Sequence, residues 1–224
     1  MRLFPILMAL FVTILLVSNT VAVKITHVGP FYFDGATILF PIAYIFGDVL
    51  TEVYGYKRSR VVVWTGFFAC IIMSLVYCLV GILPAAADWQ QQNAYMAILG
   101  QTPRIVVASL VAYLCGEFIN AYILSKMKIA TKGRFLWTRT IGSTMVGQGV
   151  DTVLFVAIAF TGVISSNLLL YMIVSNYVFK TVFEILATPL TYAAVGFVKK
   201  AESVDYYDVD TDFNPFKVTF KDMV

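Results

Sequence analysis

Long apolar stretches alternate with short polar turns along the first 198 residues of the chain. Six of these stretches approach the roughly 20 residues that an α-helix needs to cross a bilayer. The two-residue alternation of half-buried strands is absent, and an open sheet would leave backbone groups unpaired in lipid. The pattern therefore predicts an all-α polytopic membrane protein, a bundle of six transmembrane helices. We expect the spans near residues 3–23, 36–55, 61–83, 103–124, 140–163 and 168–197.

The first and last stretches are unusual in length. The first is longer than the roughly 7–15 apolar residues of a cleaved signal peptide, which favours a retained helix. The last contains Pro189, which removes a helical hydrogen bond, so we expect a kink there.

Composition excludes a soluble enzyme, because 60% of the residues are hydrophobic and 13% are charged. In soluble chains about 45–50% of the residues are hydrophobic and about 25% are charged. The net charge of +3 does not indicate a nucleic-acid partner, because the basic residues lie in separate turns. Eleven of them flank the spans on the side of the termini, and only Lys24 and Arg104 lie on the other side. The positive-inside rule therefore predicts that both termini are cytoplasmic.

Metal and disulfide chemistry are not indicated. Cys70, Cys78 and Cys115 lie inside apolar stretches without CxxC spacing, and His27 is the single histidine. We therefore predict no cofactor.

Two segments outside the spans are distinctive. Residues 84–102 combine polar and aromatic positions and could gate a binding site, although a surface loop is the favoured interpretation. Residues 199–224 form an acidic tail, expected to be cytoplasmic and poorly ordered. Its aspartates do not match a calcium loop, because Phe213 stands where glycine is required.

Ionisable side chains inside the predicted spans are the strongest functional signal, since charges in lipid are costly and by default functional. They recur with other polar groups at spacings of three or four residues, which puts them on one helix face. These faces carry Tyr44, Asp48 and Glu52; Tyr113, Glu117 and Asn120; Thr144, Gln148 and Asp151; and Asn176, Lys180 and Glu184. The span at 61–83 has no such face and suits a lipid or partner contact; a homodimer would use it, although nothing in the sequence demands one.

A purely structural role is the alternative, with pairs such as Lys180 and Asp151 locking the bundle. Five carboxylates against one lysine favour a solute or proton pathway instead. Asp48 and Glu52 lie one turn apart and would repel, so one of them must hold a proton or face a cation. Small residues at 143, 147 and 149 indicate close helix packing.

A series of short motifs follows in order along the chain. They are Ser18-Asn19 before Lys24, Phe33-Asp34-Gly35, Phe40-Pro41, Asp48-x-x-Thr51-Glu52-x-Tyr54-Gly55, Lys57-Arg58-x-Arg60, Arg104 with Ala108-Ser109, Glu117-x-x-Asn120, Gly147 to Asp151, and Asn176 with Lys180. Over roughly residues 14–198 this order resembles the queuosine precursor transporter family, also called the vitamin uptake transporter family.

The resemblance implies an inner-membrane importer of 7-deazaguanine bases such as preQ0, preQ1 or queuine, and not an enzyme. Asp48, Glu117 and Asp151 would accept N–H donors of the base, and Tyr44, Tyr113 or Tyr177 would stack on it. The full set of expected substrate-binding residues is Asn19, Tyr44, Asp48, Glu52, Arg104, Tyr113, Glu117, Asn120, Gln148, Asp151, Asn176 and Lys180.

Energy coupling is left open by the sequence. A self-sufficient, proton-coupled transporter and a substrate-binding subunit with separate ATPase partners both fit. The chain has no Walker A motif of its own. An intramembrane enzyme is disfavoured, because no nucleophile lies near a matched base.

Overall fold

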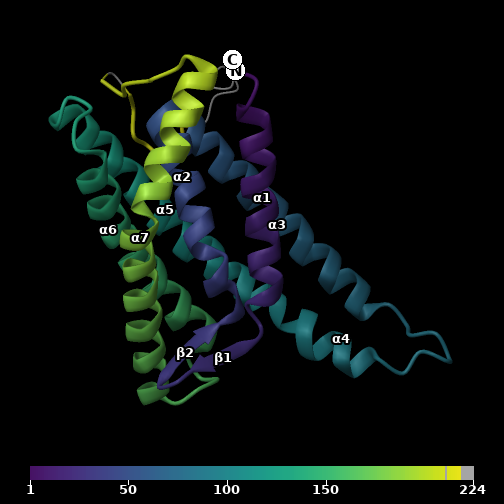
Figure 1. Cartoon of the computed structure of the whole chain (residues 1–224). Coiled ribbons are helices and arrows are strands. Elements are labelled where there is room, and N and C mark those ends of the chain that lie inside the picture. The colour runs from purple at the N-terminus through teal and green to yellow at the C-terminus, as the bar shows by residue number, and fades with distance from the viewer. Residues whose placement is uncertain (210, 218–224) are drawn as a thin grey trace.

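The computed structural model describes residues 1–209 and 211–217 (Figure 1). Its helices are α1 (Phe4–Val21), α2 (Phe40–Tyr54), α3 (Tyr56–Ile82), α4 (Gln92–Ile98), α5 (Thr102–Ala130), α6 (Leu136–Phe160) and α7 (Ser166–Glu202). Strands β1 (Ile25–Val28) and β2 (Phe31–Asp34) and two 3-10 turns, Gly35–Ile38 and Leu99–Gln101, complete the described elements.

Each predicted span coincides with one of these helices: α1, α2, α3, α5, α6 and α7. Five segments are long and apolar enough to cross a membrane: α1, α3, the continuous α4–α5 segment, α6 and α7. The chain is therefore a multi-pass, predominantly α-helical membrane protein. Helix α2 has 15 residues. It rises only about 22 Å, less than the ~30 Å hydrocarbon core.

A β-hairpin follows α1. The sequence pattern predicted helices alone and did not indicate this hairpin. Its strands are antiparallel, with Thr26 opposite Phe33. Gly29 in the turn has a φ of +57°, a conformation that favours glycine. Strands of four residues are too short to give a clear alternating pattern. The 3-10 turn Gly35–Ile38 after the hairpin takes up the start of the predicted span 36–55, so α2 begins only at Phe40.

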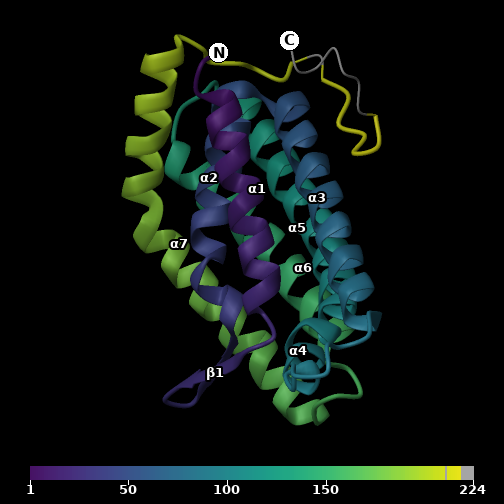
Figure 2. The same cartoon turned by 90° about the vertical axis from the view of Figure 1, so that its right-hand side faces the viewer.

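The N-terminus and the described residues that follow α7 lie at one end of the bundle and the hairpin lies at the other, as Figures 1 and 2 show. We call these the termini end and the hairpin end. Helix α7 runs the full length between them and bends along the way (Figure 2), with Pro189 inside it as predicted.

Helices α3, α5, α6 and α7 extend past the predicted spans at the termini end. Hydropathy marks only the part of a helix that suits lipid, so the charged turns beyond it were assigned to loops. As a result Lys128, Arg139 and Lys199 lie on helices, and their side chains reach into the bundle.

Helices α5 and α6 approach each other most closely. A Cβ added to Gly116 would lie 2.8 Å from the carbonyl oxygen of Gly147, and one added to Gly147 would lie 2.7 Å from that of Gly116. Both glycines are therefore needed for this contact, which confirms close packing at Gly147. Ser143 is buried one turn away.

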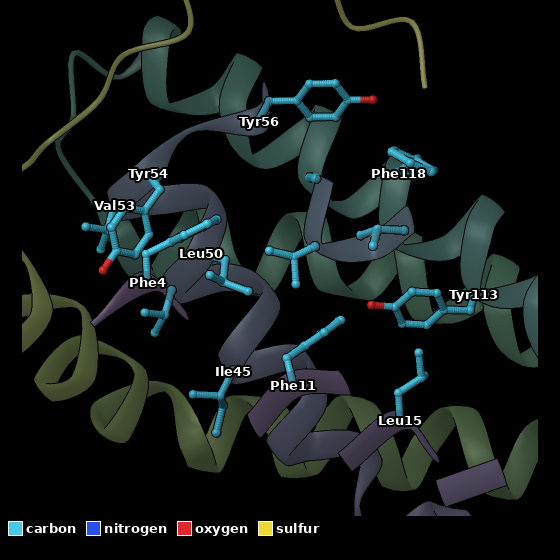
Figure 3. Close-up of a cluster of buried hydrophobic side chains, with 14 of the residues drawn as sticks. Phe4, Phe11, Leu15, Ile45, Leu50, Val53, Tyr54, Tyr56, Tyr113 and Phe118 are labelled. Atoms are coloured by element: carbon cyan, nitrogen blue, oxygen red, sulfur yellow. The ribbon is translucent and has the colours of Figure 1, made fainter. Parts of the chain in front are cut away.

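An apolar cluster joins α1, α2, α3 and α5, together with three residues of α7 (Figure 3). Phe4 packs edge-on against Tyr54 with ring centroids 5.0 Å apart, and Phe11 packs against Tyr113 at 6.0 Å. Because α2 is held by this cluster on one side, its polar face is directed to the other helices.

The segment between α3 and α5 lies at the hairpin end. The Tyr95 hydroxyl of α4 donates to the carbonyl of Tyr77, and Gln92 donates to that of Gly81, so α4 rests on the end of α3. None of the residues of α4 is buried, which favours the surface interpretation over a gate. The outward face of α3 is apolar; a homodimer contact there stays a prediction.

Candidate functional site

Polar side chains from α2, α5, α6 and α7 meet in the middle of the bundle. We call this set the central polar cluster; it consists of Tyr44, Asp48, Glu117, Asn120, Thr144, Gln148, Asp151, Lys180 and Glu184. All of them are at least 98% buried. Asp48 lies within electrostatic range of Glu117 and of Glu184, and Tyr44 lies within range of these three and of Asp151. The predicted convergence of separate helices on one region is present.

Two direct contacts organise the cluster. Lys180 Nζ lies 3.1 Å from Asp151 Oδ2 and 3.4 Å from the Thr152 hydroxyl, which is the predicted ion pair between α6 and α7. Asn120 Nδ2 donates to Asp48 Oδ1 over 3.2 Å and links α5 to α2. These contacts fix the side chains without neutralising all of the carboxylates.

Acceptor atoms without a partner distinguish the cluster from a purely structural network. Within residues 1–209 and 211–217, the buried atoms Asp48 Oδ2, Glu117 Oε1, Asn120 Oδ1 and Gln148 Oε1 receive no hydrogen bond. Neither oxygen of Glu184 accepts a hydrogen bond of good geometry, although Thr144 lies beside this carboxylate. A buried acceptor left unsatisfied costs about 1–3 kcal/mol. The arrangement is therefore suited to a ligand with several N–H donors.

A glycine shapes the place of one of these acceptors. The carboxylate of Glu117 lies against Gly47 of α2, where an added Cβ would be 2.5 Å from Oε1. Real Cβ atoms do not approach an oxygen this closely, so Gly47 makes room for the carboxylate. The position of the Glu117 carboxylate thus depends on the absence of a side chain at Gly47.

A polar chain leads from the cluster toward the hairpin end. The Thr37 hydroxyl contacts Asn176 Oδ1 at 2.9 Å and Asp34 Oδ2 at 3.3 Å, and Asp34 Oδ1 accepts from the backbone of Ala36. Asn176 lies one turn from Lys180 on α7. Sequence reasoning did not place Asp34 and Thr37 in the site, although Phe33-Asp34-Gly35 was among the motifs of the resemblance.

Two open spaces of very different size lie near these polar residues. A small cavity of about 10 Å³, enough for one water molecule at most, lies beside Asn19 and Tyr113. Their Oδ1 and hydroxyl atoms have no partner among the described residues. A groove of about 990 Å³ lies at the hairpin end and is lined in part by Lys24, Asp34 and Thr37.

Besides Asn19, Tyr113 and Asn176, which are described above, three predicted residues lie outside the cluster. Arg104 is exposed and donates to the carbonyls of Ile158 and Thr161 at 3.1 and 2.6 Å, so it caps the last turn of α6. Glu52 accepts from Arg139 and Lys199 at 2.6 and 2.9 Å, in a separate charged group at the termini end.

Tyr177 is the third. Its ring lies against Gly149, in an apolar groove between α6 and α7, and not beside the carboxylates. Of the three tyrosines expected to stack on a base, Tyr44 and Tyr113 are the ones buried near the cluster.

The charge count behind the site prediction changes accordingly. Glu52 faces cations, which is one of the two alternatives predicted for the Asp48–Glu52 pair. The sequence predicted that a single lysine faces five carboxylates inside the bundle. This count was wrong, because the helices at the termini end extend further than expected and carry three more cations inward. In the central polar cluster, four carboxylates still face Lys180.

Comparison with known proteins gives the family. Residues 34–194 match the model of the family described as "Putative vitamin uptake transporter". The chain belongs to this family. The match includes the central polar cluster and ends before the last turns of α7. The family consists of transporters, so the expectation that the chain is not an enzyme is confirmed.

Curated relatives agree with this family. The chain is 34% identical over 159 residues to the "Probable queuosine precursor transporter" of Bacillus subtilis (strain 168), covering 69% of this chain and 68% of the relative. It is 22% identical to the protein of the same name from Haemophilus influenzae, over 62% of this chain and 59% of the relative. It is 24% identical to the "Queuosine precursor transporter" of Escherichia coli (strain K12), over 54% and 52%. No solved structure matches the chain.

Proposed function

We propose that this transporter imports queuosine precursors, bases of the 7-deazaguanine class, and binds them in the central polar cluster. The names of its relatives support the substrate class. The observation that carries the proposal is the surplus of buried acceptors without partners on α2, α5, α6 and α7.

The chemistry of such a base matches this surplus. Its edge presents ring N–H and exocyclic amino donors, which a carboxylate or amide oxygen can accept. Asp48 Oδ2, Glu117 Oε1 and Gln148 Oε1 are the acceptors assigned to it. Excess negative charge would also favour a base that carries an aminomethyl cation, by the attraction of opposite charges at low dielectric.

Aromatic rings would complete the site. Tyr44 and Tyr113 are buried beside the carboxylates and offer flat surfaces for a base to stack on. The small cavity at Tyr113 would have to widen by helix movement to hold the base.

Orientation and coupling are part of the proposal. We place the termini end in the cytoplasm of a cell with this chain in its inner membrane, because basic residues concentrate there. Coupling to protons is the favoured mechanism, since four carboxylates facing one lysine can hold a proton in exchange for a cationic substrate. The alternative is a substrate-binding subunit energised by ATPase partners.

Direct binding to the purified protein tests the substrate class. Titration with preQ0, preQ1 and queuine, with guanine as control, should give saturable binding of at least one precursor and weaker binding of guanine. Equal binding of all four would contradict selectivity for the 7-deaza class. Absence of binding of all four would contradict the proposal itself.

Reconstitution separates the two energetic mechanisms. Liposomes that contain only this chain should accumulate the bound base when a proton gradient is imposed. Accumulation only after ATPase partners are added would favour the alternative.

A further inference from the structure

A group of five charged side chains closes the termini end of the bundle. We call it the gate network; its members are Glu52, Lys128, Arg139, Lys199 and Asp205. Glu52 accepts from Arg139 at 2.6 and 3.2 Å and from Lys199 at 2.9 Å, with Lys128 Nζ 3.6 Å away. Asp205 accepts from Lys128 at 2.8 Å and from Lys199 at 2.9 Å.

The network lies directly beside the central polar cluster. Glu52 is one turn from Asp48 on α2, and Lys128, Arg139 and Lys199 lie on α5, α6 and α7. These are the four helices that form the cluster. A solute bound at Asp48 can therefore leave toward the termini end only if the ends of these helices separate.

The segment 203–217, in which the structure describes every residue but 210, supplies the part of the network that is not on a helix. It crosses the termini end of the bundle, contrary to the expectation of a poorly ordered tail (Figure 2). Asp205 joins Lys128 to Lys199, and thereby α5 to α7. Next to it, Tyr206 N donates to the carbonyl of Val53, and Lys128 donates to the carbonyl of Tyr206 at 2.6 Å.

Further contacts hold the rest of this segment in place. Asp208 is buried and accepts from the backbone N–H of Tyr56 at 2.9 Å, at the first turn of α3. The Trp64 indole donates to the carbonyl of Pro215, and Arg60 donates to that of Asn214. The segment is thus attached along its length, and Asp205 is its one acidic contact with the gate network in the described chain.

We propose that residues 203–217 are a latch that keeps the termini end of the transport path closed, with Asp205 as the residue that joins it to the gate network. Without Asp205, Glu52 alone faces three cations, and their mutual repulsion favours movement of α7 away from α5 and α6. The family model ends at residue 194. The latch lies outside residues 34–194, and of its two ion-pair partners Lys128 lies inside this range.

Thiol labelling from the termini end tests the latch. The probe is Thr144→Cys, at the residue of the cluster that lies nearest to Arg139 of the network along α6, in a chain whose Cys70, Cys78 and Cys115 are replaced by alanine. Membrane vesicles are used in which a C-terminal tag is open to protease in the bath, and a membrane-impermeant methanethiosulfonate cation is added. The assay requires no substrate, so its result is independent of whether the chain carries queuosine precursors.

Asp205→Asn should raise the labelling rate about tenfold, because labelling follows the population of the open state. Asp212→Asn is the matched control, since Asp212 lies in the same segment but pairs with exposed Lys217; it should leave the rate within about twofold. Asp205→Glu should restore protection. Labelling of Asp205→Asn at the parent rate would overturn the proposal, as would an equal increase in Asp212→Asn. Unchanged thermal unfolding of each variant shows that altered labelling is not loss of fold.

Discussion

Asn120 donates to one oxygen of Asp48 over 3.2 Å and leaves the other oxygen without a hydrogen bond from any described residue. A buried carboxylate that is held on one side and open on the other is oriented for a ligand. A carboxylate with only a structural role would have both oxygens satisfied. Glu117 of α5 likewise has a buried carboxylate oxygen, Oε1, that receives no hydrogen bond from any described residue.

Replacement of Asp48 by asparagine should therefore lower uptake of the base at least about tenfold, the effect of losing roughly 1.4 kcal/mol of binding. The fold should persist, because removing a buried charge is not destabilising when its partners are neutral. Initial uptake rates and thermal unfolding, measured together with Asp212→Asn as control, check this. Undiminished uptake in Asp48→Asn would remove this residue from the site.

Gly47→Ala should reduce binding without altering any polar group. The new methyl would collide with Glu117 Oε1 and force that carboxylate from its position. We expect a loss of about 1–3 kcal/mol in the free energy of unfolding, typical of overpacking. Gly196→Ala is the control, since nothing lies within 4 Å of a Cβ at that position of α7. If both variants bind the base like the parent, Gly47 is not needed to place Glu117.

The Lys180–Asp151 pair should show strong coupling. Asp151→Ala or Lys180→Ala alone leaves a charge in the bundle and should cost about 3–5 kcal/mol. The double replacement should recover most of this loss, since neither member of the pair is then left without the other. Reversible unfolding in mixed detergent measures all three variants. Additive losses in the double variant would mean that the two groups do not act as a pair.

Closure by the latch should be insensitive to pH between about 5.5 and 8. Burial alone would raise the pKa of Asp205, but hydrogen bonds from Lys128 and Lys199 outweigh it and hold the pKa below 3.8. In a released tail the pKa returns to about 3.9. The stabilisation is therefore complete above that value and is lost as pH falls through the lowered pKa. Labelling of Cys at position 144, corrected for the reagent's own pH dependence, should be constant over this range; a steep rise between pH 7 and 5.5 would contradict it.

The helices and their polar faces could be predicted from sequence, because long apolar stretches and four-residue spacing are strong local signals. The convergence of Asp48, Glu117 and Asp151 followed from these faces. The role of Glu52 could not be predicted in the same way. It depends on cations beyond the apolar stretches, and hydropathy gives no indication of how far a helix continues outside lipid.

The contacts of the acidic tail could not be predicted for a related reason. Acidic composition at a chain end is typical of disorder, but Asp205 and Asp208 find partners on α5, α7 and α3, which are distant in sequence. The β-hairpin was missed because its strands are short. Arg104 was predicted at the right end of the bundle, although its contacts with the α6 carbonyls depend on helix packing that no local pattern encodes.

The contact of Gly116 with Gly147 limits which parts of the protein can move. Two backbones in direct contact cannot slide past one another without steric collision, so α5 and α6 should travel as a rigid unit. Alternating exposure of the substrate would then arise from rocking of α2 and α7 against this fixed pair, with Pro189 as the natural hinge.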